Sequence, residues 1–468
     1  MAAAYRFTDN ENVTFDKILA PHAAGTIKRM TEHPVVLVVQ DTTEVDLTRP
    51  EQQVAGAGTL DGGNRRGVLL HAVGAFSVGG TPLGTLSAQI INRTDEPGEK
   101  KTKAKKDTQR RNKPIEERES MRWLTGLARV REAAEQLPDT QLIGIADSEA
   151  DIYELLTQPR TTTHGRSIDF IIRACQNRAL NNEIDVTTDT AVEQKTSSQK
   201  ESGKQSAKTK ADDKNEPSEQ AYLRETVLAS PVLYTVQMPI RARVAKTTIE
   251  KKSRHKSRDA RTVTMNVRAV TVQLRPPKRV GIKLEPVTVN VVMVREINTP
   301  EGEEPVEWML LTTLPIDTLE AVKKVVEFYC RRWNIEIFFR TLKSGCRIEY
   351  RQFENIDRIE CMLGLYLIVA WRTMHVCWMG RECPDIDCEA IFEPSEWKSV
   401  YMATQRKKPP KKHPTLRDIL LLIAQLGGYV QQKNTNPGTQ TVWIGMQRMY
   451  DLAMAWDAFG PETRLKGA

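Results

Sequence analysis

Five side chains in the segment YCRRWNIEIFFRTLKSG place one carboxylate among cations at helical spacing. Tyr329, Arg332, Glu336, Arg340 and Lys343 project within an arc of roughly 80° if the segment is one helix, since successive residues turn by about 100°. The apolar Ile335, Phe338 and Leu342 then fall on the opposite side. We therefore expect one amphipathic helix, Tyr329 to Gly345, whose polar row faces outward. Such a row is either a solvated charged face or a surface that holds phosphate groups beside a carboxylate.

Two aspartates directly follow apolar runs that are typical of buried strands. Asp41 follows Val35–Gln40, and Asp147 follows Gln141–Ala146. If these strands are neighbours in one sheet, both carboxylates emerge at the same edge. The helix that carries Glu336 can then bring a third carboxylate beside them. The alternative for each aspartate is a turn or helix N-cap.

Three clustered carboxylates repel one another unless a cation lies among them. Hard oxygen ligands suit Mg²⁺, with Mn²⁺ as a substitute. Two such ions about 3.5–4 Å apart activate a water or a 3′-hydroxyl for an in-line attack on phosphorus and stabilise the leaving oxygen. The three carboxylates are therefore the predicted metal ligands, and the cations of the helix the predicted phosphate contacts.

The three motifs resemble those of the bacterial insertion-sequence DDE transposases. The pattern Y-x2-R-x3-E-x6-K from Tyr329 to Lys343 matches the signature called YREK. QDTT at Gln40–Thr43 is similar to the first-aspartate motif of this family, and ADSEAD at Ala146–Asp151 to the second. The resemblance extends from about Ala4 to Leu452 and is to the branch that contains the transposase of the composite kanamycin-resistance transposon.

This resemblance implies an RNase H-like fold of the retroviral integrase superfamily. It is a mixed α/β sheet flanked by helices, with a β-rich insertion and a helical C-terminal tail. The implied catalytic triad is Asp41, Asp147 and Glu336. The implied activity is cut-and-paste transposition: metal-dependent hydrolysis at the transposon ends, hairpin formation, hairpin opening and strand transfer. The implied partners are double-stranded DNA, as transposon ends and as target, and a second copy of the chain in a synaptic complex.

The resemblance also implies DNA contacts. Tyr329, Arg332 and Lys343 of the signature lie near the cleaved end in this family. Trp308 occupies the position of a tryptophan that stacks on a flipped base, a contact worth roughly 1–3 kcal/mol. Without the resemblance, Trp308 is an ordinary core aromatic. Arg173 matches an arginine near the DNA, and its alternative is a surface strand residue.

The composition favours a nucleic-acid partner. The 468 residues are 27% charged, with a net charge of +8 and a pI near 9.0, as is typical of proteins that bind polyanions. The N-terminus shows no basic segment followed by an apolar stretch, so we expect no secretion signal. The uncharged stretch Cys361–Trp371 is too short to span a bilayer. We therefore expect a buried helix there, in a soluble bacterial protein that is cytoplasmic and associated with the nucleoid.

The seven cysteines include no C-x-x-C pair. Cys377, Cys383 and Cys388 with His375 are an alternative zinc site, but their spacing does not match known zinc motifs. Free thiols in a reducing compartment are the favoured interpretation.

Five parts are expected along the chain. They are a remnant N-terminal helical segment (1–30), the first part of the catalytic domain (31–180), a β-rich insertion (181–315), the glutamate helix with the helices after it (316–400), and a helical dimerisation region (401–468). Further strands are predicted at Gly67–Phe76, Pro82–Asn92, Asp169–Ala174, Leu233–Ile240, Arg261–Leu274, Pro286–Ile297 and Glu307–Thr313. Helices are predicted at Arg118–Gln136, Ser148–Leu156, Leu319–Met379 and Thr415–Phe459, the last interrupted near Gly427 and Pro437.

Two polar segments have their own interpretations. Lys100–Lys113 is strongly basic and is either an arm that contacts phosphates or a solvated loop. Thr190–Gln220 is rich in Lys, Gln, Ser, Glu and Asp without an aromatic residue, which predicts a disordered loop.

One departure from the family bears on function. The family normally carries an N-terminal helical domain that recognises the transposon end, and AAYRFTDNENVTFDKILAPH already corresponds to the region after it. The sequence therefore predicts that this domain is missing. An alternative function is an N-terminally truncated regulatory or inactive transposase that forms mixed dimers and inhibits transposition. A structure-selective nuclease without strand transfer is a further alternative.

Overall fold

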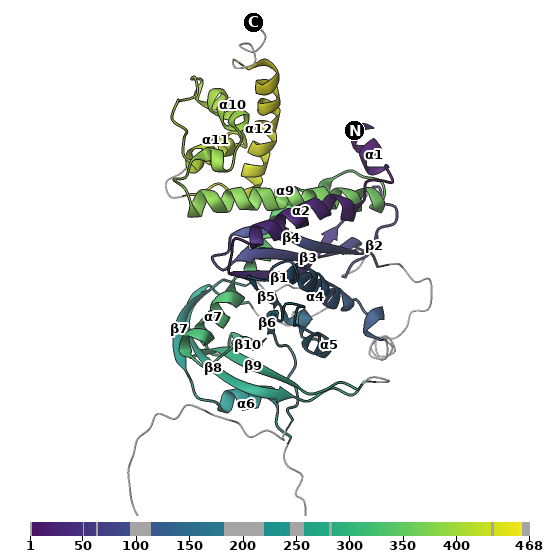
Figure 1. Ribbon diagram of the computed structural model, residues 1–468, viewed down its shortest axis with the longest axis vertical. Coiled ribbons are helices and arrows are strands. Elements are labelled where there is room, and N and C mark those ends of the chain that lie inside the picture. Colours follow the sequence, from purple (N-terminus) through teal and green to yellow (C-terminus); the bar gives the residue numbers. More distant parts are fainter. Residues whose placement is uncertain are drawn as a thin grey trace, which may run out of the picture. The chain divides into compact units, whose positions relative to one another are not determined.

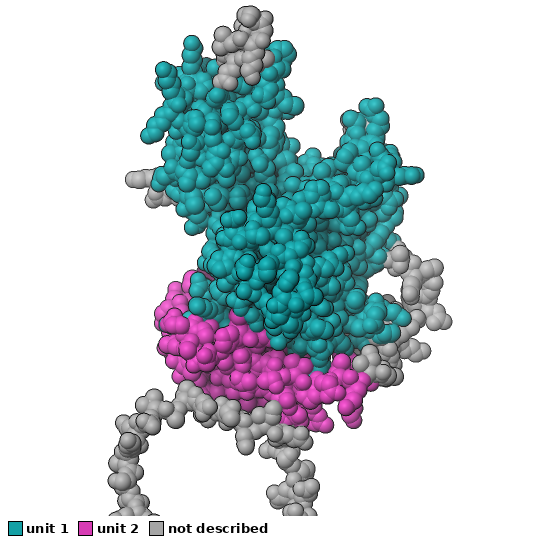
Figure 2. All heavy atoms as spheres, in the orientation of Figure 1, with its two compact units in different colours: residues 1–173, 323–468 teal, residues 174–322 magenta. Residues whose placement is uncertain are grey.

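The computed structural model describes residues 2–49, 51–61, 64–93, 114–181, 220–243, 257–279, 283–431 and 435–460. These residues form two compact units, coloured separately in Figure 2. Unit 1 comprises Met1–Arg173 and Lys323–Ala468, and unit 2 comprises Ala174–Val322. The basic segment Lys100–Lys113 lies outside the described residues, as does all of Thr190–Gln220 except its last residue.

A mixed sheet forms the centre of unit 1 (Figure 1). Its strands are β1 (Val35–Asp46), β2 (Gly58–Thr59), β3 (Arg66–Ser77), β4 (Pro82–Ile91), β5 (Gln141–Ala146) and β6 (Asp169–Arg173). The order is β2-β3-β1-β5-β6, with β4 also paired to β3. The pairs β1–β3 and β3–β4 are antiparallel, whereas β1–β5 and β5–β6 are parallel. The strands predicted in this region are confirmed, and β1 is longer than expected.

Helices cover both sides of this sheet. They are α1 (Ala2–Thr8), α2 (Phe15–Met30), α4 (Met121–Ala134), α5 (Tyr153–Leu156), α7 (Leu319–Cys330), α8 (Trp333–Arg340) and α9 (Ile356–Glu382), of which α7 begins in unit 2. Helices α2 and α9 lie side by side and both pack on β4 (Figure 1). Helix α4 packs on the strands through Val130, Ala133 and Ala134, which share a buried cluster with Val36 and Val38 of β1. The sheet is therefore buried on both faces, which explains why β1 and β3 are apolar at consecutive positions.

Helix α9 is long and apolar enough to cross a membrane by length and composition alone. Half of the qualifying window is buried inside the protein, and the helix packs on α2 and β4. Asn355 caps its N-terminus by accepting a hydrogen bond from the main-chain N–H of Arg358. The prediction of a buried helix around Cys361–Trp371 is confirmed, since Cys361, Leu363 and Leu367 are buried in α9.

Three helices follow in the C-terminal part: α10 (Pro394–Gln405), α11 (Leu416–Leu426) and α12 (Thr439–Phe459). They share a hydrophobic cluster with the second half of α9. Cys377 and Cys388 are buried in this cluster, so their side chains contact apolar neighbours. Helices α11 and α12 approach closely at Gly445, where an added Cβ would lie 1.9 Å from the carbonyl oxygen of Ile423. The predicted interruption of the C-terminal helix is confirmed, because α11 ends at Leu426 and α12 begins at Thr439.

Unit 2 is built on an antiparallel sheet in the order β10-β9-β8-β7. Its elements are α6 (Leu223–Ala229), β7 (Tyr234–Ile240), β8 (Arg261–Leu274), β9 (Val287–Ile297) and β10 (Glu307–Thr312). Val263, Met265 and Val267 of β8 are buried while the residues between them are not. The predicted alternation of a half-buried strand is confirmed. The predicted insertion, 181–315, falls within this unit.

Candidate active site

The parallel register of β1 and β5 brings two of the predicted carboxylates together. The last pair between these strands is Val39 with Ile145, and Asp41 and Asp147 each follow two residues later in the chain. Asp41 does not end its strand, because β1 continues to Asp46 against β3 and Asp41 pairs with Ala72. The prediction that β1 ends at Gln40 is wrong, since the antiparallel partner continues after the parallel partner has left.

Asp147, by contrast, stands directly after its strand. Its Oδ1 accepts a hydrogen bond of 2.9 Å from the main-chain N–H of Glu149 and caps the short 3-10 turn Ser148–Ala150. The capping role named as the alternative for Asp147 is therefore observed, through its Oδ1. The longer helix predicted at Ser148–Leu156 is replaced by this turn and the four-residue α5.

The third carboxylate, Glu336, lies on α8, which packs on β1. The prediction of one continuous helix from Tyr329 to Gly345 is wrong. Helix α7 ends at Cys330, α8 begins at Trp333, and a π-helical turn, Thr341–Gly345, follows. Between α7 and α8 the main chain makes bonds of the tighter i to i−3 type, from the N–H of Arg332 to Tyr329 and from that of Ile335 to Arg332. A tighter turn rotates each residue further about the axis, so the five polar residues do not share one outward face.

The consequence is clearest at Arg332 and Tyr329, both of which are buried. The guanidinium of Arg332 lies between two carboxylates, with Nη1 3.3 Å from Oδ2 of Asp41 and Nη2 2.6 Å from Oε1 of Glu336. The Arg332 side chain is 10% exposed, that of Asp41 15% and that of Glu336 40%. Arg332 thus links the strand that bears Asp41 to the helix that bears Glu336.

The electrostatics of Asp41 reflect its crowded position. Burial and the nearby charge of Asp147 raise the pKa of Asp41 to about 7. The main-chain N–H of Thr42, which donates to Oδ1 at 2.7 Å, and the charge of Arg332 lower it, while Glu336 raises it further. A half-buried carboxyl with a raised pKa beside two other carboxylates is a group whose ionised form gains from an added cation.

A single cavity of about 520 Å³ connects these groups. It is lined by Asp41, Thr42, Thr43, Asp147, Glu149, Arg332, Glu336, Phe339, Arg340, Lys343 and Ser344. The described residues contain no group of three His, Cys, Asp or Glu already gathered as a metal site. The oxygen ligands nevertheless suit a hard divalent cation, and the positive charge beside Asp41 and Glu336 is supplied by Arg332 in this structure. Asp41, Asp147 and Glu336 would hold such a cation, and Arg332 would compete with it for Asp41 and Glu336.

The other cations of the predicted row lie differently. Lys343 donates from Nζ to the carbonyl oxygen of Glu44 at 2.9 Å and lies 3.6 Å from Glu349, so it braces β1. Arg340 is exposed at the rim of the cavity. Its side chain makes no hydrogen bond or ion pair with the part of the chain that the structure describes.

Tyr329 and Arg173 lie close to this centre. Burial raises the pKa of Tyr329, against the charges of Arg332 and Arg173, which lower it. The charges of Arg332 and Arg173 therefore both act on Tyr329. Trp308 lies on β10 of unit 2, where it is half-buried and pairs with Val294 of β9. Its predicted stacking on a base stays a prediction.

Arg122 on α4 belongs to the site and was missed by reasoning from the sequence. Its Nε donates to Oγ1 of Thr42 at 2.9 Å, and its Nη2 lies 2.7 Å from Oε2 of Glu149. It thereby joins the segment after the first aspartate to the segment after the second. The only signal in the sequence was an arginine beside Trp123 on a helix, which is equally typical of a surface position.

A buried histidine extends this network behind Asp41. The Nδ1 of His71 lies 2.9 Å from Oγ1 of Thr42, and its Nε2 lies 3.3 Å from Oε1 of Gln40. Burial and the charge of Arg122 lower the pKa of His71 to about 3, so the ring is neutral and orients the two side chains that flank Asp41.

Comparison with known families agrees with this geometry. Residues 152–372 match the family model described as transposase DDE domain, and residues 368–455 match that described as transposase Tn5 dimerisation domain. The chain therefore contains regions that are similar to the DDE domain and to the dimerisation domain of transposases. The match confirms the predicted RNase H-like fold, because the DDE domain has that fold and the structure shows a mixed sheet flanked by helices. Such a domain acts on DNA by cleavage and strand transfer, and the second domain indicates a homodimer.

The region that matches the DDE domain contains only one of the three proposed catalytic carboxylates. It includes Glu336 and the residues around it, whereas Asp41 and Asp147 precede it, so their assignment depends on the register of β1 and β5. The YREK grouping, the missing end-binding domain and the inhibitory mixed dimer stay predictions.

Proposed function

We propose that this chain catalyses cut-and-paste DNA transposition, with Asp41, Asp147 and Glu336 as the catalytic carboxylates. The observation that supports this most directly is the convergence of three segments on one cavity. The register of β1 and β5 aligns the two aspartates, and Arg332 ties Asp41 to Glu336. The segments occur in the order expected of the DDE transposases.

The three carboxylates would hold Mg²⁺, for which Mn²⁺ can substitute. When bound, such ions activate a water or 3′-hydroxyl and stabilise the leaving oxygen. The protein's own contribution is position: Arg122 and His71 fix Thr42 beside Asp41, and Lys343 fixes β1 against the segment after α8. Arg340 at the rim is placed to bind a phosphate of the DNA backbone.

The DNA contacts of the family complete the proposal. Tyr329, Arg332 and Lys343 would act near the cleaved end, with Arg173 close by, and Trp308 would stack on a flipped base. Two chains associated through the C-terminal helices would hold two transposon ends in one complex.

The test is DNA nicking, hairpin formation and strand transfer on precut transposon ends, measured with Asp41→Asn, Asp147→Asn and Glu336→Gln. Each substitution keeps the shape of the side chain and removes its charge, so we expect metal-dependent activity to fall by roughly 10³-fold or more. Asp139→Asn, at an exposed position, is the matched control and should retain activity. Metal-dependent activity that survives in any of the three variants would contradict the proposal. Nicks without hairpins or joined products would identify a nuclease.

A further inference from the structure

The outer side of β4 is an edge of the unit 1 sheet. One side of β4 pairs with β3, from Phe76 with Pro82 to Leu69 with Ile91. Among the described residues, no strand pairs with its other side. An unpaired edge offers main-chain N–H and C=O groups to another strand, so folded proteins usually cover it.

Side chains cover the first half of this edge. Arg29 donates from Nε to the carbonyl oxygen of Leu83, and Trp371 donates from Nε1 to that of Pro82 at 2.9 Å. The main-chain N–H of Thr85 donates to Nε2 of His22 at 3.0 Å. The carbonyl oxygens of Pro82 and Leu83 and the N–H of Thr85 are therefore already paired.

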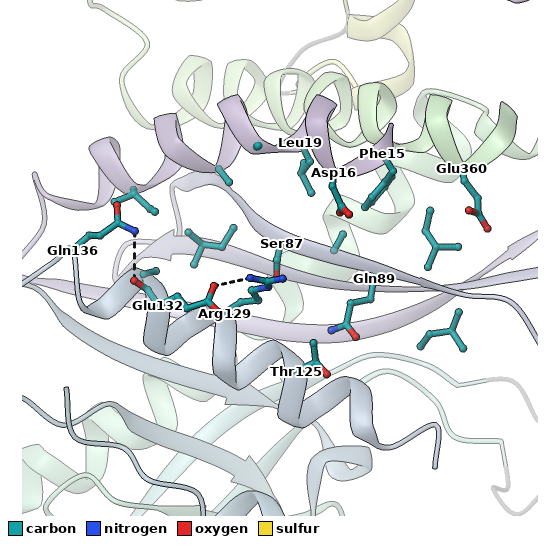
Figure 3. A pocket seen from close by; sticks show the side chains of 18 residues that line it. Phe15, Asp16, Leu19, Ser87, Gln89, Thr125, Arg129, Glu132, Gln136 and Glu360 are labelled. Carbon is teal, nitrogen blue, oxygen red and sulfur yellow. Dashed lines mark hydrogen bonds and ion pairs between the residues drawn. The ribbon is translucent and has the colours of Figure 1, made fainter. Parts of the chain in front are cut away.

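The second half of the edge, residues 86–91, borders a cavity of about 770 Å³ (Figure 3). Figure 3 shows α2 on one side of the strand and α4 on the other. The α2 wall is mainly apolar, with Phe15, Leu19, Ala20, Ala23 and Ile27. The α4 wall is mainly polar, with Thr125, Arg129, Glu132, Ala133 and Gln136. Ser87 lies between them, and its Oγ is buried without a hydrogen-bond partner among the described residues.

The charges of this groove are predominantly acidic. Asp16, Glu132 and Glu360 line it together with one cation, Arg129, whose Nη1 lies 2.7 Å from Oε2 of Glu132. Figure 3 shows Asp16 on α2 and Glu360 on α9, with Phe15 between them. Acidic side chains repel the DNA backbone, so the groove suits a protein segment with basic residues.

A strand added at this edge would contact both the apolar α2 wall and the polar α4 wall. Side chains of a strand alternate between its two faces, so one set would meet α2 and the other α4. We propose that the groove along residues 86–91 of β4 binds an extended segment of a partner protein by strand addition. That segment alternates apolar residues, which face α2, with basic or polar residues, which face α4 and the groove's carboxylates.

The test uses the full chain and a fluorescein-labelled heptapeptide of alternating lysine and valine. Fluorescence anisotropy gives its dissociation constant, and amide hydrogen exchange gives the protected residues. We expect protection at 86–91 and affinity at least about tenfold higher than for the same composition with its valines grouped together, because grouping destroys the period of two. Equal affinity for the two peptides would overturn the proposal.

Charge variants separate the groove from general attraction. Asp16→Lys combined with Glu360→Lys should weaken binding by at least about tenfold. Glu301→Lys combined with Asp317→Lys makes the same charge change at exposed positions of unit 2 and should leave affinity within about twofold. Equal losses in both double variants would refute a specific groove.

A steric variant provides an independent measurement. Ala20 is exposed and lines the groove, so Ala20→Trp should fold and fill the space that the peptide needs. Binding that survives this substitution contradicts the proposed location. A short DNA duplex provides a second check on the location. If the duplex displaces the peptide, and if it binds the Ala20→Trp variant as tightly as the unmodified chain, the peptide binds at the DNA site. That result would also contradict the proposed location.

Discussion

Replacing Arg332 with methionine tests whether this guanidinium takes the place of a cation between two carboxylates. Methionine keeps most of the length of the side chain and removes its charge. The substitution leaves Asp41 and Glu336 without their shared partner, at distances of 3.3 and 2.6 Å in the intact protein. Arg340→Met is the matched control, because Arg340 carries the same charge near the end of the same helix and is exposed.

The expected magnitude follows from the exposure of each carboxylate. Removal of one partner of a buried ion pair costs about 3–5 kcal/mol, and the Asp41 side chain is 15% exposed. The pair with Glu336, whose side chain is 40% exposed, adds only about 0–1 kcal/mol. Asp41 can relieve part of the cost by taking up a proton, since its pKa is already raised to about 7. We therefore expect a loss of about 2–4 kcal/mol in the free energy of unfolding without divalent ions.

The assay is urea denaturation in EDTA and in excess Mg²⁺ or Mn²⁺. In the intact protein Arg332 would compete with a cation for Asp41 and Glu336, so the stabilising effect of the cation should be smaller. In Arg332→Met the cation enters without that competition, and the gain in stability should exceed that of the intact protein by at least about 1.4 kcal/mol, equivalent to tenfold tighter binding. A gain no larger than in the intact protein, or an equal change in Arg340→Met, would refute the reasoning.

Three further predictions concern stability, each measured by urea denaturation. Arg122→Ala removes hydrogen bonds that join the two aspartate-bearing segments and should lower the free energy of unfolding by about 2–3 kcal/mol. The control Arg129→Ala breaks only an exposed ion pair on the same helix and should cost under about 1 kcal/mol. Equal losses in the two variants would contradict a bridging role for Arg122. Burial and the charge of a neighbouring arginine lower the pKa of His22 to about 4, so its contribution is complete above pH 6.5 and is lost as the pH falls toward 4, by up to about 3 kcal/mol. His22→Gln should flatten this dependence, and an unchanged pH profile would contradict the assignment. Gly445→Ala forces a Cβ to within 1.9 Å of a carbonyl oxygen of α11 and should cost about 1–3 kcal/mol, whereas Gly438→Ala, with no atom within 4 Å, should be nearly neutral; similar costs would show that the helices adjust.

The local pattern of apolar and polar residues was sufficient to predict most helices and strands of the fold. β5 and β8 have the predicted bounds, and the alternation of Val263, Met265 and Val267 identifies the buried face of β8. These features depend on residues close together in the sequence, whose period fixes which side is apolar. The strand that carries Asp41 was predicted too short, because its final six residues are held by β3, a partner that no local pattern reveals.

The spatial relation of the site residues was predicted in part. Asp41 and Asp147 come together as expected, since two buried parallel strands meet at the same edge of a sheet. The polar row on one helix was not found, because the chain tightens between α7 and α8 and turns Tyr329 and Arg332 inward. The prediction applied the spacing of one continuous α-helix to the whole segment, whereas the chain forms a tighter turn between α7 and α8.

The sequence by itself indicated the residues that we propose as catalytic: two aspartates after apolar runs, and a glutamate among cations at helical spacing. These features are chemical identities and short-range periods, which are readable in one dimension. Only the tertiary structure decided that Arg332 lies between Asp41 and Glu336, that Arg122 joins the segments after both aspartates, and that half of the β4 edge is open. Each of these depends on contacts between residues far apart in the chain, and the energy of such contacts is defined only once packing has brought the elements together.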